Sequence, residues 1–253
     1  LSGIEIDGIL LVNSGITPVT NVPSIASTVR SSPESGCSIV TYTGAGAVGT
    51  IGHGLNASPG MMIVKSRGTE NWHVYHKGLD ATAPQDYYVR LNSTGARSNY
   101  DGFWNDTAPT SSVFTVGSDG GTSGASNFVA YCFAPVEGYS AMGSYTGNGS
   151  SSDGPFVYTG FKVSWLMVKN TTTSGETWTI YDAARDPHNL ATNRLQPNAS
   201  DAETSGTAAR DKDFLSNGFK VRGGSGEQNT SGDNYVYLAF ASNPFASNGG
   251  LAR

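Results

Sequence analysis

The chain repeats itself, and this repeat limits the fold more than any other feature of the sequence. Six short blocks recur in the same order, and the two copies of each block lie between 103 and 107 residues apart. The pairs are YTG at 42–44 and 145–147, MMIVK at 61–65 and WLMVK at 165–169, WHVY at 72–75 and WTIY at 178–181, RL at 90–91 and 194–195, VFTV at 113–116 and GFKV at 218–221, and NFVAYCF at 127–133 and NYVYLAF at 234–240. Because self-similarity at a fixed separation marks a duplicated structural unit, we predict two units of about 100 residues with the same order of strands.

Both units are expected to consist of β-strands. Their apolar runs are short, rich in β-branched and aromatic residues, and bounded by Gly, Pro, Asn and Ser, and no stretch keeps a helical periodicity. Only residues 183–209 contain enough Ala, Leu and Arg for a short helix. The predicted fold class is therefore all-β, with two tandem, internally duplicated β-sandwich units of a jelly-roll or lectin-like kind.

The blocks MMIVK and WLMVK are apolar at successive positions, so both faces of these strands are apolar. Such a pattern is typical of a central strand that is covered on both sides. The cover is a loop, the sister unit or a neighbouring subunit, and the sequence does not decide between them.

The first 37 residues belong to neither unit. EIDGILLVNSG at 5–15 is expected to form a terminal hairpin around the Asp7-Gly8 turn, and the Pro-, Ser- and Thr-rich stretch that follows resembles an extended linker. We divide the chain into a hairpin of a preceding β module (1–15), a linker (16–37), a first unit (38–142) and a second unit (143–253). This organisation suggests the C-terminal part of a longer polypeptide.

The composition argues against several classes of partner. Only 14% of the residues are charged, the net charge is −5 and no Lys/Arg cluster occurs, so we expect no binding of nucleic acid. No apolar run is long enough for membrane insertion. Cys37 and Cys132 leave the redox compartment open, and Cys132 is expected to be a buried thiol because it lies in an apolar run.

A search for catalytic chemistry gives no convincing set. No G-x-S-x-G, H-E-x-x-H, C-x-x-C or D-x-D-x-D-G pattern occurs, and the acidic residues are scattered. Asp182 and Asp186 flank Arg185, which indicates a structural ion pair or a loop brace. We therefore predict no catalytic residues, no metal ligands and no cofactor.

The segment NYDGFWND at 99–106 is the best candidate for a binding site. Tyr100 and Trp104 lie beside Asp101 and Asn105 in an expected surface loop. Aromatic faces next to carboxylate and amide groups suit a sugar, which needs stacking and directed hydrogen bonds. The alternative is that Phe103 and Trp104 close one end of the sandwich, as Phe214 would in the second unit.

Several stretches resemble one known family. They are WNDTAPTSSVFTVG at 104–117, the run from NFVAYCFAPVEGY at 127–139 to YTGF at 158–161, YDAARDPHN at 181–189 and DFLSNGFKV at 213–221. The similarity extends over about residues 38–253 and is to a domain of unknown function at the C-terminal ends of tail-fibre and other virion proteins of tailed phages, especially marine and cyanobacterial ones. The resemblance implies no activity and no site residues.

The resemblance implies a virion protein on an extracellular appendage, assembled as a homo-oligomer, most often a trimer, with other virion proteins. Our first hypothesis is the C-terminal part of a phage tail fibre or similar appendage that contacts a glycan or protein of the host surface. The alternatives are a polysaccharide depolymerase or glycoside hydrolase, and a head decoration or fibre protein without a ligand.

Overall fold

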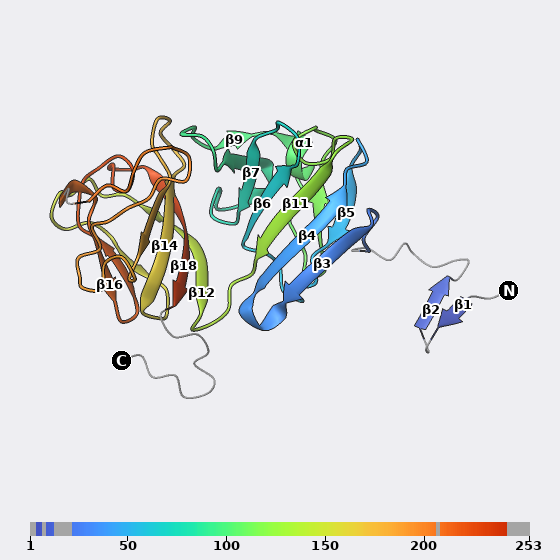
Figure 1. Cartoon of the computed structure of the whole chain (residues 1–253), viewed down its shortest axis with the longest axis horizontal. Helices are drawn as coiled ribbons and strands as arrows, with labels where there is room; N and C mark the ends of the chain where they lie inside the picture. Colours follow the sequence, from blue (N-terminus) through green and yellow to red (C-terminus); the bar gives the residue numbers. More distant parts are fainter. Residues whose placement is uncertain (1–3, 7–8, 13–21, 206–207, 242–253) are drawn as a thin grey trace.

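The computed structural model describes residues 4–6, 9–12, 22–205 and 208–241 (Figure 1). About 40% of the described residues are in strands and 6% in helices, and the sheets are antiparallel. This confirms the predicted all-β sandwich fold. The part of the chain that the structure describes contains no helix long and apolar enough to cross a membrane.

A seven-stranded antiparallel sheet is the main element of the first half of the chain. A two-stranded sheet packs on one face of it, and the core between the two includes Tyr42, Ile51, Phe114 and Phe128. The seven strands, in spatial order, are β3 (Ser27–Ser32), β4 (Cys37–Thr43), β11 (Asn127–Phe133), β6 (Met61–Ser66), β7 (Trp72–His76), β8 (Tyr87–Arg90) and β9 (Ser98–Asn99), and the two-stranded sheet pairs β5 (Gly49–Gly52) with β10 (Val113–Val116).

The second half of the chain contains a four-stranded and a three-stranded sheet, which enclose a core of their own. The four-stranded sheet has the order β12 (Ser140–Thr146), β18 (Asn234–Ala241), β14 (Val163–Asn170) and β15 (Thr179–Asp182), and the three-stranded sheet has the order β13 (Phe156–Tyr158), β17 (Gly218–Val221) and β16 (Lys212–Leu215). Outside these sheets, β1 (Ile4–Ile6) pairs antiparallel with β2 (Ile9–Val12), and the Asp7-Gly8 turn of the predicted hairpin lies outside the described residues.

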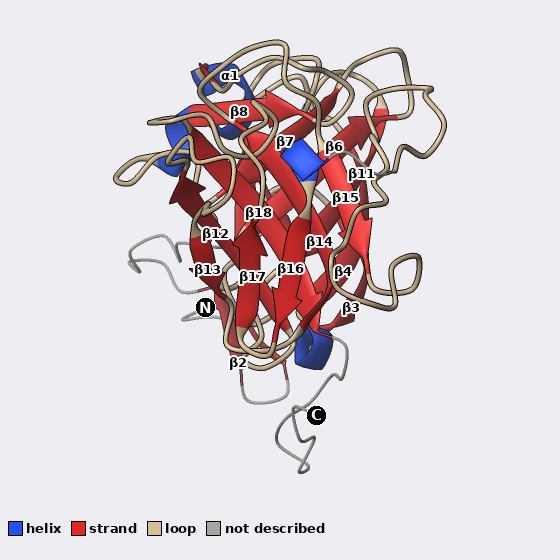
Figure 2. Ribbon diagram, turned by 90° about the vertical axis from the view of Figure 1, so that its left-hand side faces the viewer, coloured by secondary structure: helices blue, strands red, loops and turns tan. Residues whose placement is uncertain are grey.

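Among the described residues, helical structure is confined to short segments. They are the single turn α1 (Asp101–Trp104) and the 3₁₀ turns Pro33–Ser35, Pro84–Asp86 and Ala208–Arg210. The sequence led us to expect a short helix within residues 183–209. The described part of this region contains only the first two residues of the 3₁₀ turn Ala208–Arg210. Figure 2 shows long loops gathered at the end of the molecule that carries α1.

Strand β3 differs from the sequence expectation, which assigned residues 27–32 to the linker. These residues pair along their whole length with β4, from Ser27 opposite Tyr42 to Ser32 opposite Cys37. The segment is mostly polar and exposed because β3 is an edge strand with few buried neighbours, and an exposed edge leaves no apolar pattern in the sequence.

The two large sheets pack face to face, and this contact explains the strands that are apolar on both sides (Figure 1). In β6, Met62 and Val64 point into the first core, whereas Met61 and Ile63 point to the seam between the sheets. The four-stranded sheet contributes the other side of this seam with Met142, Met167, Trp178, Val236 and Leu238. The second cover is therefore the sister unit.

Polar contacts also cross the seam. The indole Nε1 of Trp178 donates to the Arg90 carbonyl at 2.9 Å, and His76 Nε2 lies 3.0 Å from the Tyr237 carbonyl oxygen. Burial lowers the pKa of His76 to about 4. The ring is therefore neutral at pH 7, and its Nε2–H can donate to the carbonyl.

Equivalent tyrosines make the same contacts in both halves. The Tyr42 hydroxyl donates to the Thr122 carbonyl at 2.7 Å, and the Tyr145 hydroxyl donates to the Gln228 carbonyl at 2.9 Å. Tyr42 stacks on Phe128 and Tyr145 stacks on Tyr235, with ring centroids 5.1 and 4.9 Å apart. The sequence repeat thus corresponds to a repeated set of strand pairings and side-chain contacts.

Candidate functional site

The four predicted binding residues lie in and around α1, but they do not form one surface. Tyr100 is 40% exposed, and Asp101 and Asn105 are exposed as well. Trp104 is only 1% exposed, because its indole packs against the ring of Tyr75 inside the first core. The expectation that Trp104 presents a face to a ligand is therefore corrected: Trp104, together with Phe103, closes the end of the sandwich.

The one-turn geometry of α1 explains why Trp104 points inward. The Asn105 amide donates to the Asp101 carbonyl at 2.7 Å, and Asn105 itself has a φ of 52°, a left-handed conformation that Asn tolerates. Next to it, a side chain at Gly117 would lie 2.0 Å from the Gly102 carbonyl oxygen. The turn is thus pressed against β10, and its last two residues are turned into the core.

A polar hollow of about 300 Å³ opens beside Tyr100. It combines aromatic rings, two carboxylates, an amide and a guanidinium. Its lining residues are Glu70, Asn71, His73, Tyr88, Arg90, Tyr100, Phe103 and Asp119.

Hydrogen bonds fix one wall of this hollow. The Tyr100 hydroxyl donates to Asp119 Oδ2 at 2.9 Å, and the Gly121 amide donates to Asp119 Oδ1 at 2.7 Å. The bond to Asp119 raises the pKa of Tyr100, because ionisation would place a second negative charge beside the carboxylate. Tyr100 is thus held as a neutral phenol with an exposed ring.

His73 forms the floor of the hollow and is almost completely buried. Neither ring nitrogen has a hydrogen-bond partner among the described residues, and the ring lies 3.9 Å from that of Phe103, centroid to centroid. Burial, reinforced by the charge of Arg90, lowers the pKa of His73 to about 4. The floor is therefore an uncharged imidazole at neutral pH.

Sequence reasoning found Tyr100 but missed the other polar members of the hollow. Glu70 and Asn71 precede β7, Tyr88 and Arg90 belong to β8, and Asp119 lies in the loop after β10. These residues share no spacing or motif. The strand pairing of β7 with β8 brings them together.

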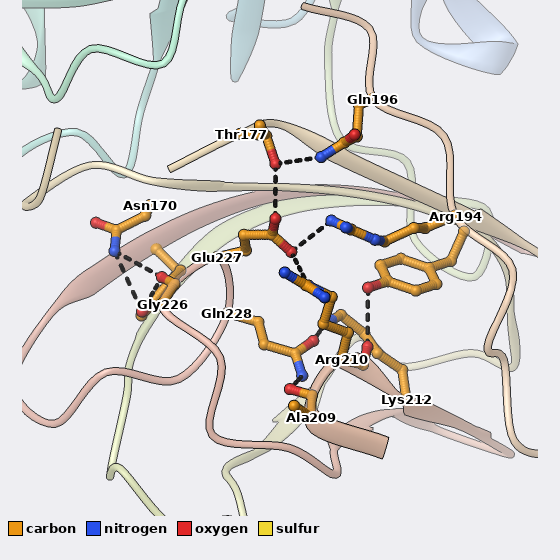
Figure 3. A network of polar contacts seen from close by, with 12 residues as sticks. Asn170, Thr177, Arg194, Gln196, Ala209, Arg210, Lys212, Gly226, Glu227 and Gln228 are labelled. Carbon is orange, nitrogen blue, oxygen red and sulfur yellow. Dashed lines mark hydrogen bonds and ion pairs between the residues drawn. The ribbon is translucent and has the colours of Figure 1, made fainter. Parts of the chain in front are cut away.

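The second unit has a cluster of charged side chains, which we call the charge cluster: Arg194, Lys212 and Glu227, which are buried, and Arg210, which is partly exposed (Figure 3). Arg194 and Arg210 both donate to Glu227 Oε2, at 2.5 and 2.8 Å, and the Thr177 hydroxyl donates to Oε1 at 3.0 Å. Burial alone would raise the pKa of Glu227, but the two guanidinium groups outweigh it and lower the pKa. The carboxylate is therefore ionised and fully used by its neighbours.

The predicted ion pair around Arg185 is confirmed. Arg185 Nε lies 2.6 Å from Asp182 Oδ2, and its Nη1 lies 2.9 Å from Glu203 Oε2. Asp186 makes no ion pair with Arg185 in this arrangement; it accepts the amides of Thr192 and Asn193 at 2.8 and 2.7 Å. Both aspartates thus brace the loop after β15.

Both cysteines are free thiols. Cys132 is buried, as predicted, and burial raises the pKa of its thiol to about 12, so it is not a reactive thiolate. Cys37 is half-buried and makes no disulfide. Among the described residues, no three His, Cys, Asp or Glu side chains converge on a common point.

Comparison with known proteins gives a family but no activity. One family model, described as a domain of unknown function (DUF7483), matches residues 13–244 and so includes both halves of the chain in a single domain. We found no matching curated protein and no matching solved structure. Because the match extends over most of the sequence, the chain belongs to the DUF7483 family.

Proposed function

We propose that this chain is a structural and adhesive module of a tailed-phage appendage, such as a tail fibre, and that it binds a host-surface glycan in the hollow beside Tyr100. The observation that supports a glycan is the lining of the hollow. The exposed Tyr100 ring offers a stacking face, and Asn71, Glu70 and Arg90 offer hydrogen-bond donors and acceptors for hydroxyl groups. The virion setting rests on the sequence resemblance alone.

The proposed assembly is a homotrimer, as is common in phage fibres. The seven-stranded sheet is wider than the sheet that covers it, and its outer face over β3, β4 and β11 has a groove of about 640 Å³ with Ile39, Tyr131 and Phe133 in its lining. Ile39 is 48% exposed. A second copy of the chain is the occupant that we propose for this apolar face, because the face continues the seam already buried by the sister unit.

A glycan array followed by titration of the retained glycans tests the adhesive role. We expect Tyr100→Ala to weaken binding at least tenfold, because it removes the stacking face. Tyr158→Ala is the matched control: Tyr158 is 67% exposed on β13, in the other unit, and its loss should leave binding unchanged. Equal binding by both variants would contradict the assignment of the hollow.

The mass of the assembly in solution tests the oligomer, and antibody labelling of phage particles tests the virion setting. A label on the tail supports the appendage, whereas a label on the head supports the decoration protein. A stable monomer without any glycan signal would contradict both the fibre and the adhesin.

A glycoside hydrolase is the second candidate, because Glu70 and Asp119 both line the hollow and such enzymes use two carboxyl groups. Asp119 is already bound by Tyr100 and by the Gly121 amide, which leaves it little freedom for this role. Release of reducing sugar ends from a bound polysaccharide, abolished by Glu70→Gln, would favour the enzyme.

A further inference from the structure

Lys212, in β16, is the one cation of the charge cluster without an ion-pair partner among the described residues. Its side chain has no exposed surface. An ammonium carries three N–H donors, and a buried one is stable only when these donors find acceptors. Within the described part of the chain, Lys212 Nζ has one hydrogen-bond acceptor, the side-chain oxygen Oε1 of Gln228, and the nitrogen otherwise lies 4.7 Å from the centre of the Tyr181 ring.

A second buried lysine in the same unit shows what a satisfied ammonium looks like. Lys169 Nζ donates to the carbonyls of Asn170, Glu176 and Thr94, at 2.7, 3.0 and 3.4 Å. Burial lowers the pKa of Lys169 to about 8 and that of Lys212 to about 7. Near neutral pH a large fraction of Lys212 is therefore the free amine, which is the nucleophilic form.

The side chain of Gln228 is held against this amine. Gln228 is 1% exposed, and its Nε2 donates to the Ala209 carbonyl at 3.0 Å. Its backbone amide donates to the Ser225 carbonyl, and its own carbonyl accepts the Tyr145 hydroxyl at 2.9 Å. The amine and the carboxamide are thus two buried groups in direct contact, each anchored by its own element, as Figure 3 shows for the surrounding network.

We propose that Lys212 and Gln228 form an intramolecular isopeptide bond, which joins β16 to the turn before β18. This inference rests on the charge cluster and is independent of the proposed glycan site.

The reaction needs no outside reagent. The lone pair of Lys212 Nζ attacks Cδ of Gln228, a C–N bond forms, and the bond from Cδ to Nε2 breaks. Nε2 takes up the proton that Nζ loses and leaves as ammonia, so the product is a secondary amide and one NH₃. Contact between the two groups makes the step effectively unimolecular.

Glu227 places a negative charge near the reacting pair. It precedes Gln228 in the chain, and its negative charge is the strongest opposing charge on the Lys212 amine. Arg194 and Arg210 fix its carboxylate.

The mass of the intact chain under denaturing conditions tests the proposal, because only a covalent bond survives unfolding. We expect the purified protein to be lighter than its sequence mass by one ammonia. After digestion with trypsin, a branched peptide should join residues 211–220 to residues 223–253, with no cleavage after Lys212.

Lys212→Met and Gln228→Met should both restore the full sequence mass. Lys169→Met is the matched control, since it removes a buried amine that has no carboxamide partner, and it should keep the loss of ammonia. A folded wild-type protein with the full sequence mass would overturn the proposal, and so would an ammonia loss that maps to other residues. The wild-type measurement decides even where a variant fails to fold.

Discussion

The two units place an equivalent tyrosine at the same point of their large sheets, but they surround it with opposite chemistry. Tyr75 pairs with Met62 across the strands, and Tyr181 pairs with Leu166, its counterpart. The Tyr75 ring meets the indole of Trp104, at 6.2 Å between centroids, whereas the Tyr181 ring meets the amine of Lys212. One end of the duplicated fold is filled by aromatic rings and the other by charges.

Two neighbouring positions follow the same division. His73 in the first unit corresponds to Thr179 in the second, as their equivalent partners Val64 and Val168 show. Gly121 corresponds to Glu227, since each precedes the carbonyl that accepts the equivalent tyrosine hydroxyl. A side chain at Gly121 would come within 2.4 Å of His73 Nε2, so a glutamate cannot replace it. The strand pairing is the same in the two units, but the side chains that pack around the equivalent tyrosine differ together. They make this end aromatic in the first unit and charged in the second.

The largest expected effect is the loss of the aromatic filling. Trp104→Ala should lower the free energy of unfolding by about 4 kcal/mol, because it leaves a cavity beside Tyr75. Chemical denaturation measures the change. Tyr100→Ala, from the same segment but with an exposed side chain, should cost about 1 kcal/mol or less. Equal losses would mean that the ring is not what holds this end.

Removal of Glu227, the acid at the centre of the charge cluster, should destabilise the second unit. Glu227→Ala leaves Arg194 buried without its carboxylate partner, and we expect a loss of about 3 kcal/mol in the free energy of unfolding. Glu203→Ala is the matched control, because it breaks an ion pair whose acid is 42% exposed and should cost less than about 1 kcal/mol. If both variants are equally stable, the charge cluster does not support the fold.

The histidine of the aromatic end predicts an acid sensitivity. His73 has its pKa lowered to about 4 by burial, whereas an exposed histidine has a pKa of 6.5, so between these values the unfolded chain binds more protons. Stability should therefore fall as the pH drops from 6.5 to 4, by about 3 kcal/mol for this residue.

Thr179, the residue of the second unit that corresponds to His73, suggests a variant for testing this pH dependence. His73→Thr, which copies Thr179, should flatten the fall in unfolding free energy between pH 6.5 and 4. Part of the fall should remain, because burial also lowers the pKa of His76 to about 4. An unchanged pH profile in this variant would show that the pKa of His73 in the folded state is not lowered.

The smallest expected effect concerns a contact that the two units share, the hydrogen bond from a tyrosine hydroxyl to a backbone carbonyl. Tyr42→Phe and Tyr145→Phe each remove one hydroxyl that donates to a backbone carbonyl, and each should cost about 1 kcal/mol. The two losses should agree within the error of chemical denaturation. A clear difference would show that the two hydrogen bonds contribute unequally to the free energy of unfolding although their geometry is equivalent.

The architecture was largely predictable from the sequence, because it depends on patterns that repeat. The nearly constant separation of the blocks indicated the duplication, and the apolar run MMIVK indicated a strand covered on both faces. Strand β3 was missed because an exposed edge strand needs no apolar residues. The identity of the cover, the sister unit, depends on the packing of the two sheets and not on any local pattern.

The candidate site was less predictable. Tyr100 was found through its aromatic and polar neighbours, but the burial of Trp104 depends on a single helical turn that packs closely against Gly117. The charge cluster escaped notice because Arg194, Lys212 and Glu227 are far apart in the chain and each looks like an ordinary surface residue. Only the fold brings their charges together.

The positions of the first and last strands of the two large sheets determine how the molecule responds to a pulling force. β3 is an edge strand with a single partner, so tension at its end would peel it from β4 one residue at a time. β18 lies between β12 and β14, so tension at its end must shear two ladders at once. We therefore expect the two ends of the fold to differ in their resistance to tension. β3, where the chain enters the sheets, should detach at a lower force than β18, where the chain leaves them.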